Sequence, residues 1–334
     1  MNKLVLFISV TTLFMNFSCN TSQTGNVESL TYRGYDNCIR IFNNTAEVII
    51  IPEVGGRVLA YRVNENNIIY RNPAQDGKSF DDFLKERFDP DAGRFDLGYE
   101  KITQPIHDTL WMGPYDVEIT GRYSVKLTSQ KSHLMGVQLE REFILDSESS
   151  HLIVRQTMIN QSDKETDWFF WGRTLVPIGG KLVMPINPNS KYPRGWGHFI
   201  GNPWEFSTDE PSSPLVEIRD DNLIFHANTT GNSYKFATNA EQGWMVYAHD
   251  DLLFVKKFDV DPQGVYTDDQ TTIVYTHGRN FIEMEPNSPH AFLQPGERYT
   301  FDEHWWLFEN PNGLDQQKDI LETTKRALEK AIIP

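Results

Sequence analysis

Short apolar and aromatic stretches follow one another from about residue 30 to residue 308. They are rich in Val, Ile, Phe, Tyr and Trp and are separated by clusters of Gly, Pro, Asn and Asp. This pattern is typical of antiparallel β-strands joined by turns. The clearest predicted strands are AEVIIIP (46–52), GRVLAYRV (56–63), NIIYR (67–71), YSVKLTS (123–129), VQLEREFIL (137–145), HLIVRQTMIN (151–160), WMVYAHDD (244–251), LLFVKKF (252–258), TTIVYTH (271–277) and YTFDEHWWLF (299–308). Because no helical pattern intervenes, the sequence predicts an all-β sandwich or barrel.

Two stretches have helical patterns instead, a short one at residues 79–88 and a C-terminal one at residues 314–332. In the second, one stripe at helical spacing carries Leu314, Ile320, Leu321, Thr324, Leu328 and Ile332. We expect this helix to cover a face or an edge of a sheet. Residues 185–214 are rich in Gly and Pro and predict a long loop of the kind that often carries function. No repeat or linker interrupts residues 30–334, so we expect a single domain there.

The first 29 residues predict export. One cation, Lys3, precedes an apolar run that is too short to span a bilayer, and Ser18 stands directly before Cys19. The Ser-Cys pair resembles a bacterial lipobox, which implies that residues 1–19 are a signal peptide and that Cys19 becomes the lipidated N-terminus. Polar residues 20–29 then form a tether. We expect a lipid-anchored protein at the outer membrane or facing the periplasm, with secretion as the alternative.

Composition narrows the set of partners. The 334 residues include 46 acidic and 31 basic ones, giving a net charge of -15, and no basic stripe is present. Nucleic acid is therefore not an expected partner. The acidic loops at 89–96 and 259–269 lack the regular ligand spacing of an EF-hand and are interpreted as turns. No zinc spacing, phosphate loop or dinucleotide fingerprint appears, so we expect no metal or other cofactor, and we expect a monomer.

The stretch FIEMEPNSPH, residues 281–290, places two acids on one face of a predicted strand. Side chains alternate along a strand, so Glu283 and Glu285 share a face while Ile282 and Met284 share the other. Two readings stay open. The acids form a plain solvated strand face, or they line a concave site in which their repulsion raises one pKa and suits the pair to proton transfer.

The surrounding sequence FIEMEPNSPHAFLQPGERYTFDEHWWLF resembles the end of the aldose 1-epimerase (galactose mutarotase-like) superfamily, with MEP at Glu285 and LQPGE at 293–297 as the matching pieces. IIIPEVGGRVLAYRVNENNIIYRNP is similar to its opening hairpin, and HLIVRQTMINQSDKETDWFFWGRT to its central strand pair. Over residues 30–308 the resemblance implies an antiparallel β-supersandwich with Glu285 as catalytic base. Within the superfamily, the chain resembles a divergent, exported DUF4380-like bacterial lipoprotein.

The chain departs from that superfamily at the residue expected to donate a proton, the general acid. The strand that carries a catalytic His in that superfamily reads DWFFWGRTLVP here, with no histidine. His107 is our candidate replacement, against the alternative of a loop histidine without a task. Arg173 either holds the carboxylate or sulfate of an acidic sugar or forms a surface ion pair with one of the many acids of this chain. The residues expected to contact the sugar are Arg94, Glu100, Trp111, Trp171, Arg173, Arg194, Trp196 and Glu283.

Three functions remain open. The first is an exported carbohydrate-active protein that binds, and as an isomerase epimerises, a sugar or uronic acid. The second is a glycan-binding lipoprotein without turnover. The third is a polysaccharide lyase acting on uronates, in which an arginine neutralises the carboxylate.

Overall fold

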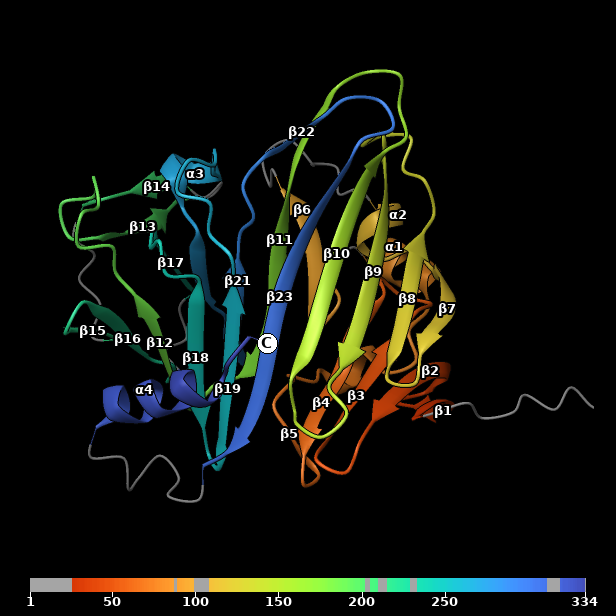
Figure 1. Cartoon of the computed structure of the whole chain (residues 1–334), viewed down its shortest axis with the longest axis horizontal. Helices are drawn as coiled ribbons and strands as arrows, with labels where there is room; N and C mark the ends of the chain where they lie inside the picture. The colour runs from red at the N-terminus through yellow and green to blue at the C-terminus, as the bar shows by residue number, and fades with distance from the viewer. Residues whose placement is uncertain are drawn as a thin grey trace, which may run out of the picture.

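The computed structural model describes residues 26–86, 89–98, 108–201, 205–209, 215–228, 233–310 and 319–333. Within these residues two antiparallel sheets, here called the large and the small sheet, form a β-sandwich (Figure 1). The large sheet has thirteen described strands and the small sheet has ten. This architecture confirms the predicted all-β class. No described helix is long and apolar enough to cross a membrane.

The large sheet contains, in spatial order, β1 (Val27–Tyr32), β2 (Tyr35–Phe42), β3 (Ala46–Ile51), β4 (Arg57–Val63), β6 (Gly93–Gly98), β11 (Thr166–Pro177), β21 (Phe281–Pro286), β20 (Ile273–His277), β17 (Tyr234–Thr238), β13 (Trp196–Ile200) and β14 (Glu205–Ser207), with β5 (Asn66–Asn67) beside β4 and β22 (Ala291–Leu293) beside β11. The small sheet contains β15 (Val216–Arg219), β16 (Asn222–His226), β12 (Lys181–Pro185), β18 (Trp244–His249), β19 (Leu252–Phe258), β23 (Arg298–Glu309), β10 (Leu152–Asn160), β9 (Val137–Leu145), β8 (Ser124–Ser129) and β7 (Tyr115–Gly121). The helices are the 3-10 turn η1 (Pro73–Gln75), α1 (Phe80–Glu86), α2 (Asp108–Trp111), α3 (Thr267–Gln270) and α4 (Ile320–Lys330).

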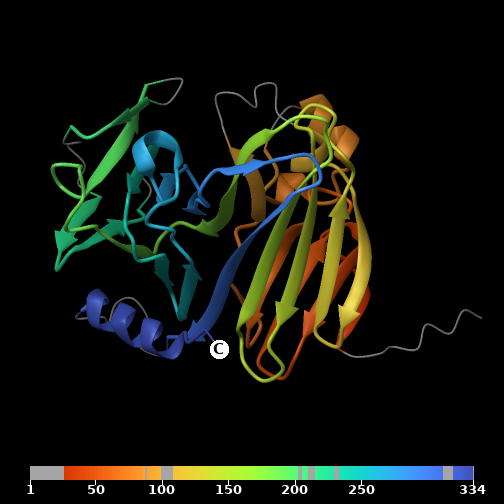
Figure 2. The same cartoon turned by 45° about the horizontal axis from the view of Figure 1, so that its top comes forward.

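Two long strands join the halves of the sandwich. Strand β11 pairs with β6 on one side and with β21 on the other, and β23 pairs with β10 and β19. Both lie near the centre of Figure 1, between the N-terminal half (β1–β10) and the C-terminal half (β12–β21). In Figure 2 the red and orange strands of the large sheet lie behind the yellow and green strands of the small sheet. Segments far apart in sequence therefore meet at β11 and β21.

The observed helices refine the predictions. The first covers residues 80–86, and residues 87 and 88 lie outside the described residues. Helix α4 packs its buried Ile320 and Ala327 against Val183 and Val246, so it covers the outer face of the small sheet as expected. The predicted stripe was wrong at its end, because Ile332 lies past the helix and is 70% exposed. Leu314 lies outside the described residues.

Two other predictions were partly wrong. NIIYR contributes only its first residue to a strand, because Ile68 and Ile69 bury their side chains in the core and the Tyr70 amide donates to the Leu175 carbonyl at 2.9 Å. The segment 185–214 is not simply a loop, since β13 and β14 lie within it and extend the edge of the large sheet. Strand pairing satisfies the backbone there despite the glycines and prolines.

The apolar core fills the space between the sheets. On β21, Ile282 and Met284 enter this core, and on β17 and β20 Phe236 and Tyr275 do the same. Alternation along the strands therefore turns the intervening residues to the outer face of the large sheet. That outer face at β6, β11, β21, β20 and β17 carries the candidate site.

Candidate functional site

Both glutamates of β21 are buried on the outer face of the large sheet. Glu283 is 4% exposed and Glu285 is 0% exposed. The alternative of a solvated strand face is therefore wrong. An ionised carboxylate without water must have charged or hydrogen-bonding partners, or shift its pKa. The two glutamates meet this requirement differently.

Glu283 is paired with two arginines. Its Oε1 lies 2.8 Å from Nη2 of Arg94, and its Oε2 lies 3.1 Å from Nε of Arg173. Burial alone would raise the pKa of this carboxyl, but the two guanidinium groups lower the pKa to about 2. Glu283 is therefore ionised throughout the physiological range.

The arginines are matched by further carboxylates. Nη1 of Arg173 lies 3.2 Å from Asp96 and Nη2 lies 3.6 Å from Asp89, while Nη1 of Arg94 lies 3.4 Å from Asp89. The ring of Trp111 stands 5.2 Å from the Arg94 guanidinium carbon and 5.0 Å from that of Arg173. An incoming carboxylate would have to compete with these internal partners for Arg173.

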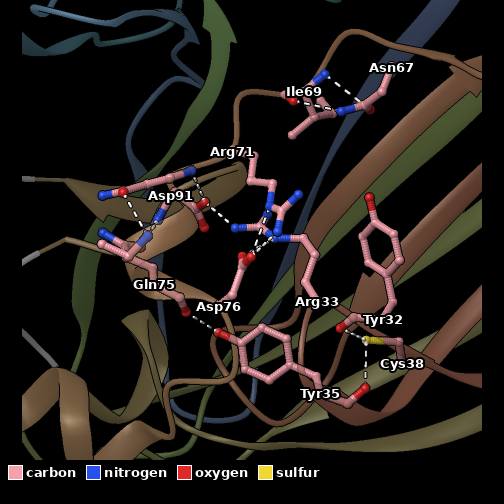
Figure 3. Close-up of polar contacts among 12 residues, drawn as sticks. Tyr32, Arg33, Tyr35, Cys38, Asn67, Ile69, Arg71, Gln75, Asp76 and Asp91 are labelled. Carbon is pink, nitrogen blue, oxygen red and sulfur yellow. Dashed lines mark hydrogen bonds and ion pairs between the residues drawn. The ribbon is translucent and has the colours of Figure 1, made fainter.

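A neighbouring charge network fixes the segment that carries Asp89 and Arg94. Asp91 pairs with Arg33, as Figure 3 shows, and its Oδ1 lies 2.6 Å from Nη1 of Arg57. The Asp91 amide also donates to the Gln75 side chain at 2.7 Å. These contacts hold the chain in place just before β6 begins.

Glu285 has no such arginine partner. Its Oε2 accepts a hydrogen bond from Nε1 of Trp171 at 2.6 Å, and its Oε1 makes no hydrogen bond with any described residue. Burial raises the pKa of Glu285, and the charge of Glu283 raises it further, while Lys235 and Arg173 oppose the rise without cancelling it. Of the two acids, Glu285 is therefore the one better suited to exchange a proton.

A small pocket opens beside Trp171, with about 280 Å³ of empty space including the part open to solvent. Nζ of Lys235 lies 4.8 Å from the Trp171 ring centre and 4.9 Å from that of Phe199. Aromatic faces beside polar groups are suited to a sugar, which has C–H groups on its faces and hydroxyls on its rim. The described lining residues are Phe169, Trp171, Phe199, Lys235, Thr267, Asp268, Val274 and Asn287.

The other residues predicted for the site do not all lie at this pocket. Trp196 packs in the core, 5.8 Å from the ring of Phe236, and does not face the pocket. Arg194 is exposed in the turn before β13. His290 pairs with Asp167 at 2.6 Å and lies against the pocket residue Phe169 at 5.1 Å. The candidates His107, Glu100 and Cys19 lie outside the described residues.

Sequence reasoning identified only Trp171 among the described lining residues and missed the other seven, including Lys235, Asp268 and Asn287. Lys235 is the single charged residue of β17, on the outer face between two aromatic neighbours. That isolated charge was a usable signal. Asn287 follows the glutamate strand directly, whereas Asp268 belonged to an acidic loop that we had interpreted only as a turn. Among the described residues, no group of three or more potential ligands is arranged to hold a metal.

Comparisons with known proteins agree with this fold. Residues 105–308 match the family described as a domain of unknown function, DUF4380. A candidate aldose 1-epimerase from Escherichia coli K12 aligns over 82% of this chain and 99% of its own, with 12% identity and a TM-score of 0.58. Galactose mutarotase-like proteins from Lactobacillus casei (81% and 100% covered, 14% identity, TM-score 0.57) and Clostridium acetobutylicum (85% and 98% covered, 12% identity, TM-score 0.52) are also similar. No curated protein matches the chain.

Proposed function

We propose, from the premise that this chain belongs to the DUF4380 family and has a galactose mutarotase-like fold, that it binds a carbohydrate in the pocket beside Trp171. The observation that carries the proposal is the combination of aromatic rings with orphaned buried acceptors. Trp171 and Phe199 line the pocket with aromatic rings, and Oδ1 of the 2% exposed Asn287 has no partner among the described residues. A hydroxyl-bearing ligand would supply the missing donor.

The volume favours a small ligand. The empty space beside Trp171 is only about 280 Å³ even when the part open to solvent is included. A single sugar ring, or the end of a chain, suits this space better than the interior of a polymer. The lyase alternative loses its main support, because Arg173 is already surrounded by Glu283, Asp96 and Asp89.

The test is a ligand-observed NMR screen of the mature protein with glucose, galactose, glucuronate and galacturonate. We expect saturation transfer to at least one sugar, and we expect Trp171→Ala to abolish it. Trp244→Ala is the matched control, since Trp244 lies on β18 beside α4 rather than at the pocket. Absence of binding to every sugar, or equal loss in both variants, would refute the proposal.

A second candidate, anomeric proton transfer, is favoured by the raised pKa and unpartnered Oε1 of Glu285. In that function the side chain of Trp171 or Lys235 would first shift, because Glu285 is fully buried at rest. Glu285 would then accept the proton of the anomeric hydroxyl while the C1–O5 bond breaks and the ring oxygen takes a proton from water. Two-dimensional exchange NMR on a bound sugar measures the rate directly. Glu285→Gln should abolish enhanced exchange while leaving binding, and a sugar that binds without faster anomer exchange would leave binding as the function.

We also propose that the protein acts outside the cytoplasm as a lipoprotein. The support is the N-terminal sequence alone, with its short apolar run and Ser18-Cys19 pair. Metabolic labelling with palmitate in a bacterial host should mark the full-length chain, and Cys19→Ser should remove the label. A labelled Cys19→Ser protein would contradict lipidation at that residue.

A further inference from the structure

The wall of the pocket that carries Asp268 is an unusual turn, α3. Asp268, Asp269 and Gln270 have φ angles of 45°, 61° and 75°, so three successive non-glycine residues adopt the left-handed region. Each such residue costs roughly 1–2 kcal/mol relative to ordinary backbone. Strain of this kind persists only where surrounding contacts impose it, and it is common at functional sites.

Contacts on both sides impose the turn. The Thr271 amide donates to the Thr267 carbonyl at 2.9 Å, and Asn287 Nδ2 donates to the Thr271 carbonyl at 3.2 Å. On the other side, Lys191 pairs with the carboxylate of Asp269. The two aspartates are therefore used differently, because Asp269 faces a lysine outside the pocket while Asp268 lines the pocket.

The groups around the pocket are mainly acceptors. Oδ1 of Asn287 and Oε1 of Glu285 are buried without a hydrogen-bond partner among the described residues. Asp268 adds a carboxylate, which accepts hydrogen bonds and donates none when ionised. A ligand that satisfies these groups must bring donors, and a negative charge on the ligand beside Asp268 would be repelled.

The basic residues near the pocket do not outweigh its hydrogen-bond acceptors and the charge of Asp268. Arg94 and Arg173 are matched by Glu283, Asp96 and Asp89. Lys235 is the single basic residue among the described pocket-lining residues. Its ammonium group lies 4.8 Å from the ring centre of Trp171 and 4.9 Å from that of Phe199, so these two rings already stabilise its charge.

We infer that the pocket selects an uncharged, polyhydroxylated sugar over the corresponding uronate, and that Asp268, held by the strained turn, is the specificity-determining residue. This inference rests on the proposed carbohydrate binding and names the substrate class of the same pocket. Asp268 accepts a hydroxyl hydrogen bond from a neutral sugar and repels a carboxylate in the same place.

The experiment measures dissociation constants by NMR titration for two matched pairs, galactose with galacturonate and glucose with glucuronate. We expect the wild type to bind the neutral member of at least one pair about tenfold or more tightly, as a like-charge contact requires. Asp268→Asn should shrink that ratio about tenfold or more. Asp269→Asn is the matched control, with the same charge change in the same turn, and should leave the ratio within about twofold.

Asparagine tolerates the left-handed region, so neither substitution forces the turn to rearrange. Equal urea midpoints for both variants would confirm this. Uronates bound as tightly as the neutral sugars, or equal changes in the two variants, would overturn the inference while leaving carbohydrate binding intact. If the wild type binds none of the four sugars, the proposed function itself fails, and the inference falls with it.

Discussion

The two glutamates of β21 should respond in opposite directions to the same substitution. Glu283→Gln should destabilise the protein at pH 7, because it leaves Arg94 and Arg173 buried with one fewer counter-charge. Glu285→Gln should increase the free energy of unfolding at pH 8, because the ionised carboxylate is disfavoured at that position and the amide oxygen still accepts from Trp171. Each substitution is the control for the other, since both sites share one strand and one face.

The magnitude for Glu283 follows from its pKa, which is lowered from an ordinary value of 4.5 to about 2. Each pKa unit corresponds to about 1.4 kcal/mol, so the ionised carboxylate contributes about 3 kcal/mol to stability. Its pKa in the folded state is depressed, so this contribution is fully present above pH 4.5 and is lost as the pH falls toward 2. The raised pKa of Glu285 affects stability in the opposite direction, because ionisation of this buried carboxyl lowers the free energy of unfolding as the pH rises.

The assay is urea unfolding followed by tryptophan fluorescence at several pH values between 3 and 8. At pH 7 the midpoint of Glu283→Gln should lie clearly below that of the wild type, and the gap should narrow toward pH 3. Two results would contradict the conclusion that Glu283 and Glu285 ionise differently. One is equal destabilisation by both substitutions, and the other is a midpoint difference between Glu283→Gln and the wild type that does not depend on pH.

Two further predictions concern the core behind the site. Lys256→Met should lower the free energy of unfolding by about 3–5 kcal/mol, because it leaves the fully buried Glu303 without its counter-charge, Nζ of Lys256, 2.8 Å away. Urea midpoints measure this loss. Combining Lys256→Met with Glu303→Gln should restore part of the stability. Gly172→Ala should also lower the midpoint, because the added Cβ would meet Oε1 of Glu303 at 2.5 Å. Gly121→Ala is its control, as its Cβ meets only the side chain of Ser124, and equal effects of the two would contradict the steric explanation.

The strands were predictable because their apolar periodicity reflects burial between two sheets. VQLEREFIL and LLFVKKF coincide with β9 and β19 over their whole length. The face shared by Glu283 and Glu285 was predictable for the same reason. Their burial was not, because it depends on Arg94 and Arg173 from β6 and β11, and pairing between strands so distant in sequence leaves no local signal.

The errors have physical causes as well. Trp196 was assigned to the sugar site because aromatic residues are common in such sites, but alternation along β13 turns it into the core. Arg173 was expected to reach a ligand or the surface, and neither reading anticipated that three carboxylates from three segments converge on it. Lys235 was overlooked because a single lysine in a short strand is usually solvated, whereas here two aromatic rings cover it.

The arrangement also constrains how a proton could move at this site. Glu283 is held ionised by its arginines, and the indole of Trp171 donates a hydrogen bond to Glu285 without exchanging its proton. Arg173 keeps its charge and cannot act as an acid. Among the described neighbours of Glu285, Lys235 and the hydroxyl of Thr276 remain beside the ligand as possible partners. Trp171 and Arg173 of β11 therefore supply no proton to Glu285, which narrows the proton chemistry available on this strand.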